Sequence, residues 1–328
     1  MIKKIIHSLA SRMGLTIVCN SNRHSGISIV KRYSISVTQP DINFGELIGK
    51  DPLNAALHLR YATQAIRRGK AYLAYAELKS AEFLGASRDE VKNDMQLAIA
   101  ALPKPETMNH NGYYRLTSLA SELALRSKEG NFSVLDVGGG EGMLAAFIPE
   151  ATYCLADPST NGISGIDLPF PDHSFDYVVS CHVLEHIPVE ERSAFLDQLL
   201  SKSKCGVILL NPFFIGNTYE KERLQLFIDI TNAEWAKEHL ACTLPKLDDI
   251  KLYADQRGLS FSAKPNGTLT TGIAIEFMNY FAGKAGLIEE YVRINEFFNV
   301  MFKHILDSPD YPVGYLIFLG GKPNSSKP

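Results

Sequence analysis

The chain has 328 residues, of which 45% are hydrophobic and 21% are charged, as in ordinary globular proteins. This composition excludes a disordered or fibrous chain, and the length allows a catalytic domain with a smaller one beside it. The net charge of −3 makes nucleic acid an unexpected partner, because gripping a phosphate backbone requires clustered positive charge. The five cysteines are scattered without a C-x-x-C pair, which predicts reduced thiols, a cytoplasmic location and no metal site.

Residues 1–50 read as a basic N-terminal arm, with six basic side chains and no acidic one before Asp41. Ile2, Ile5, Leu9 and Met13 fall at helical spacing, which predicts a short amphipathic helix. Such a helix either lies on an anionic surface, here the inner face of a membrane, or packs on its own domain. No apolar run reaches the ~20 residues of a membrane-spanning helix, and the start lacks the apolar core of a secretory signal.

Residues 51–103 have the spacing of three helices. Pro52 suits the first position of a helix that ends at Gly69, and a second helix is expected over Ala71–Leu84. Ser87 and Glu90 form a capping-box pattern for the third, which ends before Pro103. The segment from 69 to 85 resembles one tetratricopeptide-like hairpin, and stacked repeats need about three units for stability. The hairpin is therefore expected to dock on its neighbour, with recruitment of a partner as the alternative.

Residues 106–328 alternate between strand and helix, which indicates a parallel sheet with crossover helices. The expected fold class is α/β, a Rossmann-like sheet with helices on both faces, preceded by the small helical region. Aromatic-rich helical insertions are expected at 212–244 and 270–308, where they would build a substrate pocket. The expected strands are Phe132–Val137, Thr152–Ala156, Tyr177–Ser180, Val207–Asn211 and Tyr315–Leu319, and the expected helices include Tyr113–Arg126, Val189–Lys202 and Leu247–Arg257.

The strongest local signal is the stretch Val134-Leu135-Asp136-Val137-Gly138-Gly139-Gly140-Glu141-Gly142. Glycines after a buried strand let the backbone approach a nucleotide, and a helix start offers free N–H groups. A dinucleotide fingerprint would need glycine at position 143, where this chain has Met143. The stretch instead resembles motif I of class I S-adenosylmethionine (SAM)-dependent methyltransferases, of the type 11 kind. That resemblance implies SAM as cofactor, with Asp136 facing its methionine end and the glycines forming the floor.

Later segments resemble the same family in the same order. Tyr153–Pro158 ends a strand in an acid, so Asp157 would accept both ribose hydroxyls, as in nicotinamide enzymes. Gly165–Phe170 resembles the adenine loop, where Asp167 would accept from the exocyclic amine. Only about ten residues separate Gly142 from the second strand, so the first crossover helix should be short. The residues expected to bind SAM are Asp136, Gly138, Gly139, Gly140, Gly142, Asp157, Pro158, Ile166, Asp167, Leu168 and Cys181.

His182, just past the end of a strand, is the candidate general base, with a second-shell or cofactor-flanking role as the alternative. His182 begins the sequence His182-Val183-Leu184-Glu185-His186, which resembles the corresponding segment of quinone-biosynthesis methyltransferases. His186 and Glu185 are expected to be structural. Trp235 with Glu238–Leu240 adds a resemblance to methyltransferases of bacterial surface-polysaccharide biosynthesis. The expected function is O-methylation of a sugar, glycolipid or other small polar acceptor. The alternatives are a non-catalytic SAM-binding scaffold, or a methyltransferase for a quinone, a protein or RNA.

Overall fold

A computed structural model of the chain describes residues 15–18, 34–37, 42–127, 130–214, 216, 218–267, 269–301, 312 and 314–321. The backbone contacts divide the chain into two units, residues 1–43 and 44–328. In the first, β1 (Leu15–Val18) and β2 (Ser34–Val37) form an antiparallel pair. The amphipathic helix predicted around residues 2–13 lies outside the described residues. Among the residues that are described, no helix has the length and apolarity needed to cross a membrane.

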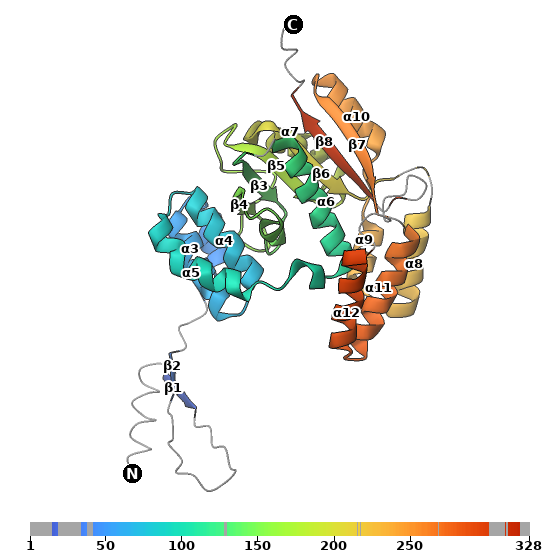
Figure 1. Cartoon of the computed structure of the whole chain (residues 1–328). Coiled ribbons are helices and arrows are strands. Elements are labelled where there is room, and N and C mark those ends of the chain that lie inside the picture. Colours follow the sequence, from blue (N-terminus) through green and yellow to red (C-terminus); the bar gives the residue numbers. More distant parts are fainter. Residues whose placement is uncertain are drawn as a thin grey trace. The chain divides into compact units, whose positions relative to one another are not determined.

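The second unit is built on a six-stranded sheet in the order β4-β3-β5-β6-β8-β7 (Figure 1). The first four strands in this order are parallel, and β8 lies antiparallel between β6 and β7. β3 and β4 are buried along almost their whole length, as expected for strands that helices cover on both faces. The predicted Rossmann-like fold class is confirmed. The strands are β3 (Ser133–Val137), β4 (Thr152–Ala156), β5 (Phe175–Cys181), β6 (Ser203–Asn211), β7 (Ser260–Asn266) and β8 (Gly314–Gly320).

Three helices pack directly on the sheet in addition to the N-terminal group. α6 (His110–Ser127) and α7 (Arg192–Lys202) contact β5 and β6, and α10 (Leu247–Gln256) contacts β7. Arg126, in the last turn of α6, lies 3.3 Å from the ring centre of Phe318 on β8 and forms an ion pair with Glu122. The strand β7 was missing from the sequence prediction, because Ser260–Asn266 is only partly buried and contains Lys264 and Pro265. Such a sequence suits an edge strand and gives little hydrophobic signal.

The N-terminal helices pack on the edge of the sheet at β4 (Figure 1). α4 is buried from Leu73 to Ala81, because α3 and α5 lie on it from one side and β4 from the other. Their apolar side chains share one hydrophobic core with β3 and β4, so the expected docking of the hairpin is confirmed. The helices are α2 (Phe44–Lys50), α3 (Ala55–Arg67), α4 (Ala71–Phe83) and α5 (Arg88–Ala101).

This packing compensates for a missing helix in the first crossover. Between β3 and β4 the chain makes only a short 3₁₀ turn, η2 (Met143–Phe147), in agreement with the predicted short crossover. α4 packs on η2 and on β4 instead, and a Cβ atom placed on Gly142 would lie 2.3 Å from the Cβ of Ala76. Lys79 on α4 donates hydrogen bonds to the carbonyls of Pro149 and Ala151, which fixes the end of the same crossover.

Of the two helix starts predicted in this group, that of α5 is confirmed and that of α3 is wrong. Ser87 and Glu90 form the predicted capping box of α5. Pro52, predicted at the first helical position, is not in a helix. α3 begins at Ala55 because the Asn54 side chain accepts from the N–H of Ala56 and therefore caps the helix there.

Residues 302–308 of the second predicted insertion lie outside the described residues, and the described parts of both insertions are mostly helical. They form α8 (Tyr219–Thr231), α9 (Glu234–Ala241), α11 (Leu269–Lys284) and α12 (Ile288–Met301), which lie together in Figure 1. A small apolar cluster of Leu224, Phe227 and Ala236, with Phe277 against it, holds α8, α9 and α11 together. Asn295 and Asn299 on α12 bond to the backbone N–H and to the ring of His110 and so tie this helix to the start of α6.

Candidate functional site

The glycine turn follows β3 at the carboxyl edge of the sheet. Gly138, Gly140 and Gly142 have φ angles of 75°, 58° and 72°, a left-handed conformation that only glycine adopts freely. A Cβ on Gly138 would lie 2.2 Å from a methyl carbon of Val183, and one on Gly139 would lie 2.3 Å from Asp136 Oδ2. No atom lies within 4 Å of a Cβ placed on Gly140. The turn is therefore closed by Val183 at Gly138 and by Asp136 at Gly139, and it is open at Gly140.

Asp136 lies under this turn and is almost fully buried. Tyr153 of β4 donates a hydrogen bond of 2.7 Å to its Oδ2. Burial raises the pKa of Asp136 to about 7, because desolvation disfavours the charged carboxylate more than the Tyr153 hydroxyl stabilises it. The side chain thus supports the turn from beneath.

Asp157, expected to hold the ribose, is occupied by donors from its own chain. Its Oδ1 accepts from Ser159 N, Ser159 Oγ and Thr160 N, and its Oδ2 accepts from Gly140 N at 2.9 Å. A carboxylate oxygen has about two acceptor positions, so Oδ1 is fully occupied by its three donors, whereas Oδ2 has a second position beside the bond from Gly140 N. Oδ2 can therefore accept one ribose hydroxyl, whereas a second hydroxyl at Oδ1 would have to displace a donor such as the Ser159 hydroxyl. The bond to Gly140 also ties the end of β4 to the glycine turn.

The loop that carries Asp157 is held in turn by the N-terminal helices. Asn161 accepts from Asp157 N and donates to Glu77 Oε1 on α4. Glu77 Oε2 lies 2.6 Å from Nδ1 of His58, whose Nε2 lies 3.0 Å from the carbonyl of Pro52. Both ring nitrogens of His58 face acceptors, so both can donate when the ring is protonated. Burial lowers the pKa of His58, but the Glu77 carboxylate outweighs burial, and the pKa is raised. The hairpin thus fixes the loop expected to bind the nucleoside.

The remaining residues expected to contact SAM have mixed exposure. Ile166 and Asp167 are exposed, whereas Leu168 lies in the core. Pro158 is exposed next to the hydrogen-bonded carboxylate of Asp157. Cys181 is partly buried at the end of β5, where burial raises the pKa of its thiol to about 12.

A cavity of about 390 Å³ opens past the carboxyl ends of β5 and β6, under the inserted helices. Its lining includes His182, Arg115, Trp235 and Tyr280, but none of the glycine-turn residues. Arg223 is bound by Glu220 and Glu276 at one side of the cavity, and Asn111 donates to the same Glu276. The predicted insertions thus supply much of the wall. Within these insertions Pro212, Trp235 and His239 line the cavity, whereas Phe277 packs in the small core between α8, α9 and α11.

His182 follows β5 and has a φ angle of 57°, which is unusual for a residue other than glycine. Its N–H donates to the carbonyl of Leu210 on β6, and its Nδ1 lies 3.2 Å from Glu185 Oε1. Burial, together with the positive charge of Arg115, lowers the pKa of His182 to about 4, against the opposing effect of Glu185. His182 is therefore a neutral side chain in the wall of the cavity.

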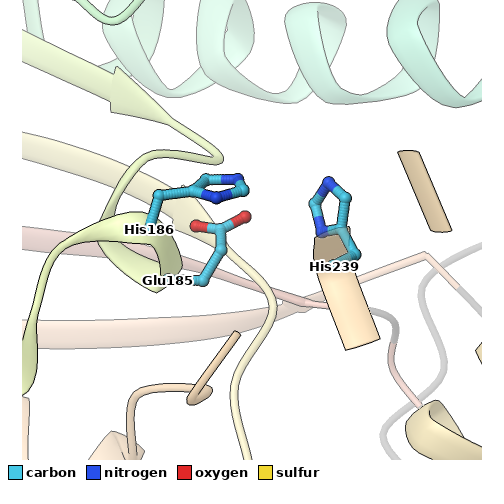
Figure 2. Close-up of side chains that lie close together, drawn as sticks. All are labelled: Glu185, His186 and His239. Atoms are coloured by element: carbon cyan, nitrogen blue, oxygen red, sulfur yellow. The ribbon is translucent and has the colours of Figure 1, made fainter. Parts of the chain in front are cut away.

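One group of side chains was not visible in the sequence. Glu185, His186 and His239 bring one ligand-type atom each to within 4.8 Å of one another (Figure 2). The sequence predicted no metal site, because His239 lies on the inserted helix α9, far along the chain from the turn η3 (Leu184–His186). The ion pair of Arg223 with Glu276 was also missed, since only the packing of α8 on α11 brings these two together, whereas Glu220 lies three residues from Arg223 on the same helix.

Comparison with known proteins assigns the domain. Residues 108–261 match a family model described as a methyltransferase domain. These residues are a SAM-dependent methyltransferase domain. The domain match covers the glycine turn, the strands β3 to β6 and His182. A comparison with curated proteins gave no match.

Solved structures with this likeness are remote in sequence. One is a putative methyltransferase from an antibiotic biosynthesis pathway of Anabaena variabilis, at 13% identity and TM-score 0.40, covering 63% of this chain and 98% of that one. Another is a SAM-dependent methyltransferase from Archaeoglobus fulgidus, at 16% identity and TM-score 0.39, covering 62% of this chain and 94% of that one. A third, a phosphoethanolamine N-methyltransferase 2 from Haemonchus contortus, has 14% identity and TM-score 0.39, and the match covers 63% of this chain and 52% of that one.

Proposed function

We propose that this methyltransferase domain transfers the methyl group of SAM to a hydroxyl of a small polar acceptor, such as a sugar or the sugar of a glycolipid. The observation that carries the proposal is the cavity at the carboxyl ends of β5 and β6, beside the glycine turn in the order of the sheet. Ligands of open α/β sheets bind at this edge. A volume of about 390 Å³ is near the lower limit of small-molecule sites, about 300–1,000 Å³, which favours a compact acceptor.

The chemistry of the cavity wall supports a polyhydroxylated acceptor. Asn109 just before α6, with Asn111 on α6, Asn266 on β7 and Asn279 on α11, supplies amide groups that both donate and accept. Trp235 and Tyr280 add amphipathic rings that can cover the apolar face of a sugar. A charged wall of Arg115, Arg223 and Glu276 is a poor match for an extended hydrocarbon chain.

The glycine turn fits the methionine end of SAM, since the space above Gly140 is free of protein atoms while Gly138 and Gly139 are closed against Val183 and Asp136. Asp157 would take one ribose hydroxyl at its Oδ2, which accepts only from Gly140 N, and Ile166 and Asp167 would face the adenine. Gly142 supports the turn against α4, and Pro158, Leu168 and Cys181 would border the nucleoside.

SAM supplies, when bound, a methyl group on a positively charged sulfur. The chain then has to orient the acceptor hydroxyl in line with that methyl and to exclude water. His182 is neutral and lines the cavity, and it would accept the proton that the acceptor hydroxyl loses when it takes the methyl group. The transfer would leave S-adenosylhomocysteine and a methyl ether.

The test is a product assay with the purified full-length protein and methyl-labelled SAM. The acceptor panel contains nucleotide sugars, extracted glycolipids, a short-chain hydroxyquinone and a protein extract. We expect label in a sugar-containing fraction and stoichiometric release of S-adenosylhomocysteine. Transfer to the quinone or protein fraction alone would reject the acceptor class. Tight SAM binding with no S-adenosylhomocysteine from any fraction would instead support the non-catalytic scaffold.

A further inference from the structure

A buried carboxylate and two imidazoles meet beside the proposed acceptor cavity. Glu185 and His186 lie on the 3₁₀ turn η3 after β5, and His239 lies on α9. Figure 2 shows the Glu185 carboxylate close to the His186 ring, with the His239 ring facing them from α9. The two imidazole rings are 5.1 Å apart between centres and nearly perpendicular. Of the three residues, only His239 also lines the cavity.

Glu185 has an oxygen without a hydrogen-bond donor. Its side chain is completely buried, and its Oε2 accepts from Asn211 Nδ2. Its Oε1 has no hydrogen-bonded partner, although His182 Nδ1 lies 3.2 Å away. A buried charge is costly unless it is paired or coordinates a metal. Apart from this contact with His182, Oε1 has lone pairs available to a cation.

The contacts of His186 are compatible with the tautomer that a metal ligand requires. Its Nδ1 lies 3.4 Å from the sulfur of Cys242, and that thiol can donate to the carbonyl of Glu238. When Nδ1 donates to the sulfur, Nε2 carries the free lone pair. Metal-ligating histidines typically use their other ring nitrogen in this way, which fixes the ring.

We propose that Glu185, His186 and His239 bind a Zn²⁺ ion. Two histidines and one glutamate form a known zinc ligand set, and with three protein ligands one position stays open. Imidazole nitrogens favour zinc over magnesium or calcium, which prefer oxygen. Bonds of about 2.0–2.2 Å bring ligand atoms closer together than the present limit of 4.8 Å, so the rings must move inward. The exposed His186 and half-buried His239 can do so around the fixed Glu185.

The ion would place an open coordination position next to the cavity, through the His239 ring that lies in its wall. A Lewis acid there would polarise an acceptor oxygen. Binding of Zn²⁺ to these three side chains does not depend on the acceptor class or on methyl transfer, so it is tested without an activity assay.

The experiment uses untagged full-length protein, first treated with a chelator and then dialysed against Zn²⁺. We expect one Zn²⁺ per chain by elemental analysis and a higher melting temperature with the ion than without it. His186→Ala and His239→Ala should each weaken binding by at least about 10²-fold in calorimetric titration. Cys242→Ser should weaken it by about 10-fold, the lower range for a residue that orients a ligand. Co²⁺ in place of Zn²⁺ should give the visible absorption bands of a Co²⁺ ion with a low coordination number.

His173→Ala is the matched control, because His173 lies on an exposed turn before β5 and outside the cluster. It should bind Zn²⁺ like the wild type. The proposal is overturned if the wild type retains no Zn²⁺ beyond that of the His186→Ala His239→Ala double variant, provided that melting curves show both folded. It is also overturned if His173→Ala loses as much affinity as His186→Ala.

Discussion

The buried carboxylate of Asp136 should make the protein less stable as the pH rises. Burial raises its pKa to about 7, whereas in the unfolded chain the group has an ordinary value near 3.8. Between these two values the native state keeps a proton that the unfolded state has released. The unfolded state therefore binds fewer protons, and stability falls as the pH rises through this range. Above about pH 7 the native carboxylate is charged, and the full penalty is present.

The difference of about three pKa units corresponds to about 4 kcal/mol at about 1.4 kcal/mol per unit. Asp136→Asn removes the charge while keeping an oxygen that can accept from the Tyr153 hydroxyl. The variant should gain stability over the wild type as the pH increases, with about half of the total, about 2 kcal/mol, appearing between pH 5.5 and pH 8. The contribution of His58, whose raised pKa acts in the same direction, is common to both proteins and cancels in the difference.

The assay is urea unfolding of both proteins at pH 5.5, 6.5, 7.2 and 8, with free energies of unfolding compared at each pH. Asp176→Asn serves as the control of opposite sign. Partial burial raises the pKa of Asp176, but hydrogen bonds from Ser133 and Lys204 outweigh it and lower that pKa. Asp176→Asn should therefore lose stability by a nearly constant amount over this range. A difference between Asp136→Asn and the wild type that does not grow with pH would refute the reasoning.

Three further predictions concern the turn, the cavity and the N-terminal arm. Gly140→Ala and Gly142→Ala should each cost about 1 kcal/mol or more of backbone strain, because both glycines have positive φ angles. Of the two, only Gly142→Ala adds a clash with Ala76, so this variant should have the lower melting temperature. Gly140→Ala should lose more SAM affinity relative to its loss of stability than Gly142→Ala does. His182→Ala should lower the turnover rate by about 10²-fold with little change in SAM affinity, and an unchanged rate at saturating acceptor would remove His182 from the mechanism. Deletion of residues 1–14 should leave SAM binding intact and reduce co-sedimentation with anionic vesicles; equal sedimentation of both forms would favour packing of the arm on its own domain.

Local patterns in the sequence were sufficient for the parallel part of the sheet and for the glycine turn. β4 has the predicted bounds, β3 begins one residue later than predicted, and β5 and β6 contain the whole of the predicted strands, because strands buried on both faces are continuous apolar runs. Gly138, Gly140 and Gly142 all have the left-handed backbone that their identity suggested. The capping box of Ser87 and Glu90 is equally local, since both partners lie within one turn.

The tertiary structure decided what each polar group is used for. The sequence placed Asp157 at a strand end, but four nearby donors bond to its carboxylate, and one of them, Gly140 N, comes from the turn after another strand. Whether a side chain is free for a ligand depends on every donor within reach, most of which are not its neighbours in the chain. The same limit applies to α4, whose docking on β4 replaces the missing crossover helix.

The cluster of Glu185, His186 and His239 marks this limit most clearly. Two of its members are adjacent in a turn, and nothing in their spacing to His239 indicates a common site. Their meeting depends on where the inserted helices α8 and α9 pack, which is set by the small apolar core around Phe227. The sequence by itself determined the parallel part of the sheet and its glycine turn, because these depend on short-range pattern, and the resemblance of that turn to motif I indicated the class of cofactor. The cavity, the occupancy of Asp157 and the candidate zinc site come from long-range packing, which no local pattern encodes.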